Sequence, residues 1–159
     1  SFDCNHRASL WDDQQEARSI LLSALPLADI VKLSEEELFL LQDCGDLTSG
    51  ARAVLDMGPQ AVLISRGEKG ACVFTPQCFC ERPAYAVQVV DTTGCGDAFL
   101  GALLYELYRL DKPLDSLGED AWGRLLAYGN AAGSLTATRR GGIPALPERE
   151  SVERLASGR

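Results

Sequence analysis

Short apolar runs typical of buried strands alternate along this chain with longer stretches of helical periodicity, and this alternation is the feature that most limits its fold. The strand-like run 29–32 precedes a helical pattern at 35–42, and the run 61–65 follows another at 48–57. Helices between strands allow neighbouring strands to run parallel while the helices cover the sheet. The sequence therefore predicts an α/β fold with a largely parallel sheet.

The predicted elements extend along the whole chain. Strands are expected at 29–32, 61–65, 71–74 and 85–90, and helices within 12–25, at 35–42, 48–57, 96–110 and 121–138, and from about residue 148. A polar loop is expected at 109–120 and a rigid extended stretch at 141–147. A chain of 159 residues has the length of one domain.

The segment 89–105, VVDTTGCGDAFLGALLY, joins an apolar run to an amphipathic helix through a turn of small residues. Gly94 and Gly96 flank Cys95 at the bend, so the backbone can turn sharply and point several N–H groups at one place. The positive end of the helix dipole lies at the same place. This turn is therefore predicted to bind an anion.

Asp97 follows the turn directly, where its negative charge would oppose a bound phosphate. One interpretation is that Asp97 takes the proton from a hydroxyl that attacks a phosphoryl group, while the turn amides stabilise the transferring oxygens. The other is that Asp97 only caps the helix and the glycines form an ordinary tight turn. Because short glycine motifs are common by chance, the residues GCGD alone favour the second interpretation.

The stretch DTTGCGDAFLGALL resembles the C-terminal signature of the PfkB (ribokinase-like) carbohydrate kinases, usually D-T-x-G-A-G-D, with Cys95 in place of the alanine. The resemblance implies that Asp97 is the catalytic base and that the backbone of Gly94, Cys95 and Gly96 contributes to the anion hole. It also implies a ribokinase-like three-layer fold, ATP as the phosphoryl donor, and Mg²⁺ and K⁺ as cofactors.

The same resemblance implies a site for a monovalent cation beside the anion hole. Asp91, at the other end of the bend, matches the family's cation ligand. The carbonyls of Thr93, Thr136 and Gly141 fall where the remaining ligands would be, whereas Ala145 stands where some relatives supply a side-chain oxygen.

Two segments nearer the start resemble fructokinases. SFDCNHRASLW resembles the D-x-N-x-R-x-x-L-W stretch of fructokinases and of 2-keto-3-deoxygluconate kinases, which implies that Asn5 and Arg7 contact the sugar. ADIVKLSEEEL resembles the segment with the N-x-x-E motif, whose glutamate, here Glu37, organises Mg²⁺ through water. Ser34 replaces the asparagine, and Ser34 with Glu37 also forms a helix capping box; both roles can coexist.

A further segment, LISRGEKGACVF, resembles the strand-turn-strand that approaches the nucleotide phosphates in this family. Gly67 and Gly70 suit a close backbone approach, and Arg66 and Lys69 add positive charge, with a plain hairpin turn as the alternative for Lys69. Asn130 falls where the family forms its adenine pocket.

Charge and composition argue against several classes of protein. The formal net charge of −8 opposes binding to nucleic acid and to anionic membranes. The first residues lack a signal-peptide profile, and no apolar stretch approaches the roughly 20 residues needed to cross a bilayer, so we expect a cytoplasmic protein. The six cysteines lack the spacing of a zinc site, so reduced thiols are expected, and a redox role for Cys78 and Cys80 is left open.

The resemblance covers essentially all of residues 1–159 but only the C-terminal half of the family pattern. We therefore expect the nucleotide-binding and catalytic portion of a sugar kinase, a single truncated domain that has little activity alone, without the lid and most sugar contacts. Fructose is the favoured substrate. The alternatives are a 2-keto-3-deoxygluconate kinase, because Arg7 can pair with a carboxylate, and a non-catalytic fructokinase-like scaffold subunit. A homodimer of the full-length protein is left open.

Overall fold

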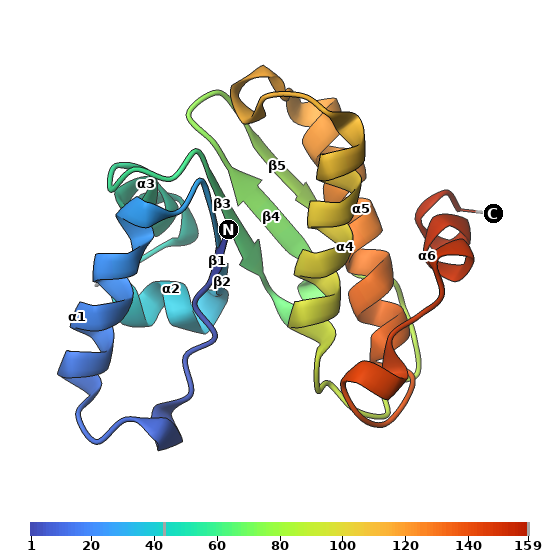
Figure 1. Cartoon of the computed structure of the whole chain (residues 1–159), viewed down its shortest axis with the longest axis horizontal. Coiled ribbons are helices and arrows are strands. Elements are labelled where there is room, and N and C mark those ends of the chain that lie inside the picture. Colours follow the sequence, from blue (N-terminus) through green and yellow to red (C-terminus); the bar gives the residue numbers. More distant parts are fainter. Residues whose placement is uncertain (43, 159) are drawn as a thin grey trace. The chain divides into compact units, whose positions relative to one another are not determined.

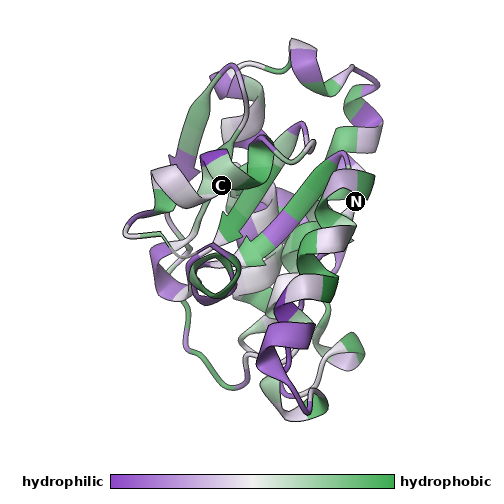
Figure 2. Cartoon of the chain, turned by 90° about the vertical axis from the view of Figure 1, so that its left-hand side faces the viewer, coloured by the Kyte–Doolittle hydropathy of each residue, from purple (hydrophilic) through white to green (hydrophobic). Residues whose placement is uncertain are grey.

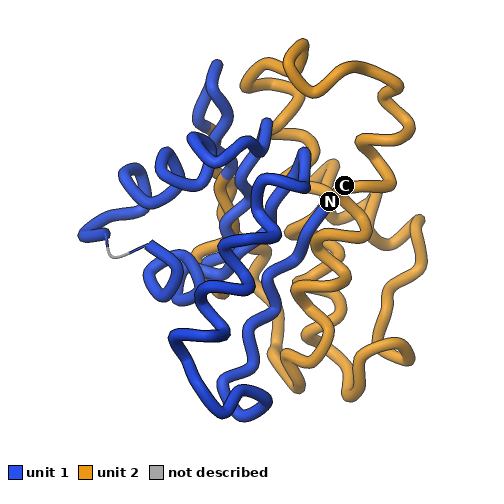
Figure 3. Tube along the Cα trace, turned by 60° about the vertical axis from the view of Figure 1, so that its left-hand side comes forward, with its two compact units in different colours: residues 1–66, 73–79 blue, residues 67–72, 80–159 orange. Residues whose placement is uncertain are grey.

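The structure, a computed structural model, describes residues 1–42 and 44–158. These residues fall into two compact units, one of Ser1–Arg66 with Val73–Phe79 and the other of Gly67–Cys72 with the chain from Cys80 onward (Figure 3). Each unit has its own helices: α1 to α3 belong to the first, and α4 to α6 belong to the second.

The described strands form a five-stranded sheet in the order β1-β2-β3-β4-β5 (Figure 1). β1 runs parallel to β2 and β2 runs parallel to β3, with Val31 opposite both Phe2 and Val62. Hydrophobic residues are concentrated in the strands (Figure 2). The strand bounds are Phe2–Asp3 for β1, Ile30–Ser34 for β2, Ala61–Ser65 for β3, Ala71–Phe74 for β4 and Phe79–Arg82 for β5.

The helices of the first unit are α1 (Gln14–Ala24), α2 (Glu35–Leu41) and α3 (Leu47–Leu55). α2 contacts β2, α3 contacts β3, and α1 contacts α2. Aspartates cap the N-termini of α1 and α3. The side chains of Asp13 and Asp46 each accept a hydrogen bond from a backbone amide of the first turn.

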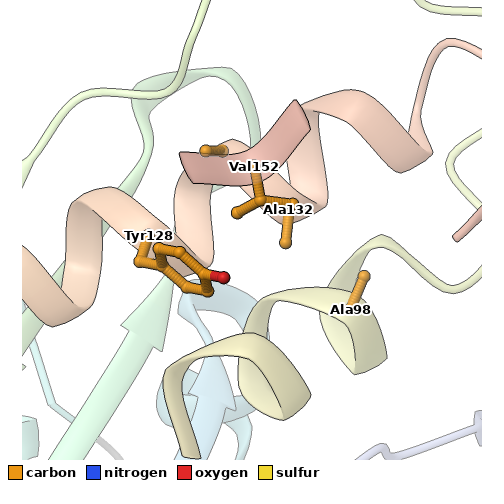
Figure 4. Packing of buried hydrophobic residues seen from close by; sticks show 5 residues of the cluster. Ala98, Tyr128, Ala132 and Val152 are labelled. Carbon is orange, nitrogen blue, oxygen red and sulfur yellow. The ribbon is translucent and has the colours of Figure 1, made fainter. Parts of the chain in front are cut away.

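The helices of the second unit are α4 (Cys95–Leu110), α5 (Glu119–Thr136) and α6 (Arg149–Ala156). α4 packs along α5, and α6 packs on α5. Alanines of α4 and α5 and a tyrosine of α5 meet a valine of α6 in a buried cluster (Figure 4), whose members are Ala98, Tyr128, Ala131, Ala132 and Val152. This packing fixes the start of α4, where the predicted catalytic turn lies.

Most predicted elements are confirmed to within two residues at each end. The prediction of a strand at 85–90 is wrong. Backbone amides of this stretch bond to α5 and to Ala137, the residue after α5: Tyr85 N–H donates to Ser134 Oγ, and Val90 N–H donates to the Ala137 carbonyl. β5 was not predicted. The stretch 141–147 is not simply extended, since it contains a short 3₁₀ helix at Ile143–Ala145.

Two further features concern the cysteines and the hydropathy of the helices. The structure forms no disulfide among the six cysteines, all of which lie in its described residues. Within the described part of the chain, no helix is both long enough and apolar enough to span a membrane.

Candidate active site

The turn before α4 is built around Gly94, which precedes the helix in the left-handed conformation with φ 79° and ψ 1°. A Cβ atom at this position would lie 3.0 Å from the Cα atom of Gly142, so a larger residue would meet backbone as well as conformational strain. The Cys95 amide donates to the Thr92 carbonyl at 3.2 Å, which closes the turn. The predicted glycine turn at the start of a helix is therefore confirmed.

Asp97 lies in the first turn of α4, two residues after its first residue. Its side chain does not cap the helix: the cap residue is Gly94, and no side chain bonds there, so the capping interpretation is wrong. The side chain is exposed, and among residues 1–42 and 44–158 its carboxylate has no hydrogen-bond or ion-pair partner. The carboxylate of Asp97 is therefore accessible at the start of α4.

Cys95 is the first residue of α4, and its half-buried thiol lies beside this turn. Burial, together with the negative charge of Asp91, raises the pKa of the Cys95 thiol. The thiol is therefore neutral at ordinary pH and adds no negative charge to the turn. This fits the replacement of a small neutral alanine by cysteine at this position.

Asp91 ties the turn to the loop after α5. Its Oδ1 accepts hydrogen bonds from the amide and the hydroxyl of Thr93 at 2.9 and 2.7 Å, and its Oδ2 accepts one from the Gly141 amide at 2.9 Å. These bonds lower the pKa of Asp91 to about 2, the amide of Gly141 contributing most. Asp91 is thus ionised and fixed in place.

The first prediction concerns the acid sensitivity of this contact. Because the pKa of Asp91 is about 2 in the folded chain against an ordinary value of 3.8, its contribution to stability is complete above about pH 4 and is lost as the pH falls toward 2. The difference in unfolding free energy between the wild type and Asp91→Asn should therefore shrink over that range. Urea unfolding followed by circular dichroism measures it. Asp115→Asn, at an exposed position, controls for the loss of one charge, and a constant difference for Asp91→Asn would contradict the prediction.

The predicted cation ligands are partly brought together. Asp91, Thr93 and Gly141 are joined by the bonds above, whereas the Thr136 carbonyl accepts the amide of Arg139 at 3.2 Å. Asp91 Oδ2 accepts one hydrogen bond and so retains acceptor capacity, which fits a cation that prefers oxygen ligands. Among the described residues, no group of three or more histidine, cysteine or acidic side chains is placed to hold a metal.

The predicted phosphate-side residues lie around a short 3₁₀ helix, η3 (Gly67–Lys69), between β3 and β4. Gly67 and Gly70 have positive φ angles of 58° and 93°, and the Gly70 amide donates to the Gly67 carbonyl at 3.0 Å. Lys69 is exposed, and Arg66 directly follows β3. The space beside Gly67 is open, because nothing lies within 4 Å of a Cβ atom built on this residue.

Asn130 lies on α5 and is buried, with 6% of its surface exposed. Its amide nitrogen donates to the carbonyls of Arg82 and Pro83 at 2.9 and 3.0 Å. The side chain that was predicted to line the adenine pocket therefore binds the protein's own backbone.

In the first unit, Glu37 completes a capping box with Ser34, as the sequence predicted. One Glu37 carboxylate oxygen accepts the Ser34 amide and the other accepts the His6 amide, both at 2.6 Å. Asn5 is exposed and has a positive φ of 43°, and Arg7 is also exposed. The two predicted sugar-contacting residues are thus accessible.

Sequence reasoning missed a partly buried ion pair between the first two strands. Lys32 is only 7% exposed, and its Nζ donates to Asp3 Oδ1 at 3.1 Å. A lysine inside the apolar run IVKL is the signal that would have indicated it. Burial and the charges of Glu37 and Asp3 raise the pKa of the neighbouring Cys4 to about 12, so this thiol stays protonated.

The fold and the turn place the chain among the ribokinase-like α/β structures. It is similar to the fructokinase of Vibrio cholerae O395 solved with fructose, ADP and calcium, with a TM-score of 0.87 and 34% identity over 98% of this chain and 49% of that one. It is also similar to a putative ribokinase II of E. coli solved with ATP and Mg²⁺, with a TM-score of 0.83 and 31% identity over 100% of this chain and 48% of that one.

Residues 1–149 match the model of the pfkB family of carbohydrate kinases, and the chain belongs to this family. A fructokinase of Klebsiella pneumoniae is 38% identical over 157 residues, which is 97% of this chain and 50% of that protein. The chain therefore spans about half the length of the curated relatives it matches.

Proposed function

We propose that this chain is the ATP-binding and catalytic portion of a sugar kinase that transfers the γ-phosphoryl group of ATP to a hydroxyl of fructose. Membership of the pfkB family and similarity to fructokinases support the proposal. The observation that carries it is the state of Asp97. Its exposed carboxylate, without a partner among the described residues, lies in the first turn of α4 directly after the Gly94 turn.

In the proposed reaction the sugar hydroxyl oxygen attacks the γ-phosphorus. The bond from that phosphorus to the bridging oxygen of ADP breaks, ADP leaves, and the hydroxyl proton passes to the Asp97 carboxylate. The amides of Gly96 and Asp97 are among those that a helix start leaves without an intrahelical acceptor. They are therefore available to stabilise negative charge on the transferring oxygens.

The proposed roles of the other residues follow the family pattern. Bound cations supply positive charge that offsets the charge of the phosphates. Each Glu37 carboxylate oxygen accepts one backbone amide, so each retains acceptor capacity for water around Mg²⁺, which fits the predicted role. The proposed K⁺ ligands are Asp91, Thr93, Thr136 and Gly141, the phosphate-side residues are Arg66, Gly67, Lys69 and Gly70, and the sugar-side residues are Asn5 and Arg7.

The second prediction tests which functions reside in these 159 residues. A polypeptide of this sequence should bind a non-hydrolysable ATP analogue weakly, because the Gly94 and Gly67 turns lie within it. It should phosphorylate fructose at a negligible rate, because the remaining half of the fructokinase pattern is needed to exclude water and hold the hydroxyl in line. Titration calorimetry and a coupled kinase assay measure the two properties.

The outcomes separate the candidate functions. Absence of nucleotide binding would contradict the proposal. Rapid fructose phosphorylation by this polypeptide would support a kinase and show that the sugar contacts lie within these residues. If the chain is joined to the part of a fructokinase that it does not cover, turnover of fructose supports the proposal, preference for 2-keto-3-deoxygluconate changes the substrate, and binding without turnover indicates a scaffold.

A further inference from the structure

The segment Arg82–Ala84, which begins at the last residue of β5, is held by α5 on one side. Asn130 donates through its amide nitrogen to two consecutive carbonyls of this segment, those of Arg82 and Pro83, at 2.9 and 3.0 Å. Since both partners are acceptors, only the NH₂ group of the side chain can face them, which fixes the orientation of the carboxamide. Both of its N–H groups are therefore used, and neither remains to donate to a nucleotide base.

The turn between β3 and β4 rests on the same segment. A Cβ atom on Gly70 would overlap the Arg82 carbonyl oxygen and would lie 2.6 Å from the Ala84 amide nitrogen. Gly70 therefore touches the backbone of the segment with its own backbone, without a flexible side chain between them. Its amide in turn closes the η3 turn by donating to the Gly67 carbonyl at 3.0 Å. A shift of the segment is transmitted directly to the turn.

We propose that Asn130 is a positioning residue for the Gly67–Gly70 turn, acting through the Arg82–Ala84 segment, and that its N–H groups do not bind adenine. The inference deepens the proposed function, because it concerns the turn assigned there to the nucleotide phosphates. Removing the Asn130 amide leaves the carbonyls of half-buried Arg82 and exposed Pro83 without their donor, which favours a shift of the segment toward water. The Gly67–Gly70 turn, whose backbone touches this segment, then moves with it. Its backbone no longer lies where the proposed contacts with the nucleotide phosphates require.

Ligands with different numbers of phosphates distinguish this role from direct recognition of the base, because only a positioning role makes the loss of affinity depend on the phosphates. Calorimetry on the 159-residue chain compares adenosine, ADP and ATP for the wild type and Asn130→Ala. A positioning role predicts an unchanged affinity for adenosine and a loss that grows with the number of phosphates, to about tenfold for ATP. An equal loss for all three ligands would mean that Asn130 contacts the adenine and would overturn the inference.

Ser134 provides a matched control on the same helix. It is also buried, with 9% of its surface exposed, and its hydroxyl oxygen accepts the amide of Tyr85, just beyond the segment, at 3.2 Å. Ser134→Ala removes a comparable bond between α5 and this part of the backbone. It leaves in place the bonds from Asn130 to the segment that contacts Gly70. It should leave ATP affinity unchanged, and an equal phosphate-dependent loss in Ser134→Ala would show that any loosening of α5 has the same effect and would overturn the specific role of Asn130.

Hydrogen exchange tests the positioning without any nucleotide. The Gly70 amide, which is bonded to the Gly67 carbonyl, should exchange at least about tenfold faster in Asn130→Ala than in Ser134→Ala, after correction for global stability. Unchanged exchange at Gly70 would overturn the inference even if ATP binding fell. If the wild type bound no nucleotide, the proposed function would fail, while the exchange of Gly70 would still decide whether Asn130 positions the turn.

Discussion

Asp97→Asn should lower the rate of sugar phosphorylation by about 10²- to 10⁴-fold while leaving the affinity for ATP nearly unchanged. The substitution keeps the shape of the side chain but removes the only group at the turn proposed to accept the hydroxyl proton. In the ground state, Asp97 makes no bond to the rest of the described chain that the substitution would break. The loss should therefore appear in kcat, not in binding.

The measurement uses the smallest assembly in which the wild-type sequence phosphorylates fructose, either these residues alone or joined to the remainder of a fructokinase relative. Asp120→Asn is the matched control. Like Asp97, Asp120 is an exposed aspartate in the first turn of a helix, here α5, so the substitution removes the same charge from a similar position. It should retain full turnover. Wild-type turnover in Asp97→Asn would remove Asp97 from the mechanism.

Gly94→Ala and Gly101→Ala should change stability in opposite directions although both alter α4 or its cap. Gly94 has φ 79°, where an alanine costs about 1–2 kcal/mol, and the added Cβ would meet the Gly142 backbone at 3.0 Å. Gly101 lies inside the helix with nothing within 4 Å of an added Cβ, so alanine there should raise the free energy of unfolding by about 0.5–1 kcal/mol.

Urea unfolding measures the stability change, and titration with the ATP analogue measures the functional consequence. Gly94→Ala should also weaken nucleotide binding, because the turn that aims the first amides of α4 is displaced, whereas Gly101→Ala should bind as the wild type does. If Gly94→Ala were as stable as the wild type, the left-handed conformation before α4 would be contradicted. If it were less stable but bound the analogue normally, the turn would have no part in holding the phosphates.

Local patterns in the sequence determined much of the fold and part of the candidate site. β3 and β4 begin and end at the predicted residues, because each is a short apolar run bounded by polar or glycine residues. The Ser34–Glu37 capping box and the Gly94 turn were predicted because their bonds and backbone angles depend on residues close together in the chain. The role of Asp97 was implied by family resemblance and stays a prediction, although its exposed position is now established.

The tertiary structure decided the features that depend on partners far along the chain. Residues 85–90 have the apolar character of a strand, but their amides find acceptors on α5 and the residue after it, which no local pattern encodes. Lys32 could be seen as an unusual lysine, but its bond to Asp3, 29 positions away, appears only when β1 and β2 pair. Asn130 likewise acquires its partners, 47 and 48 positions away, only when α5 packs against the end of β5. Sequence periodicity determines which face of an element is buried, whereas the choice of a polar partner depends on which backbone groups folding leaves unpaired beside it.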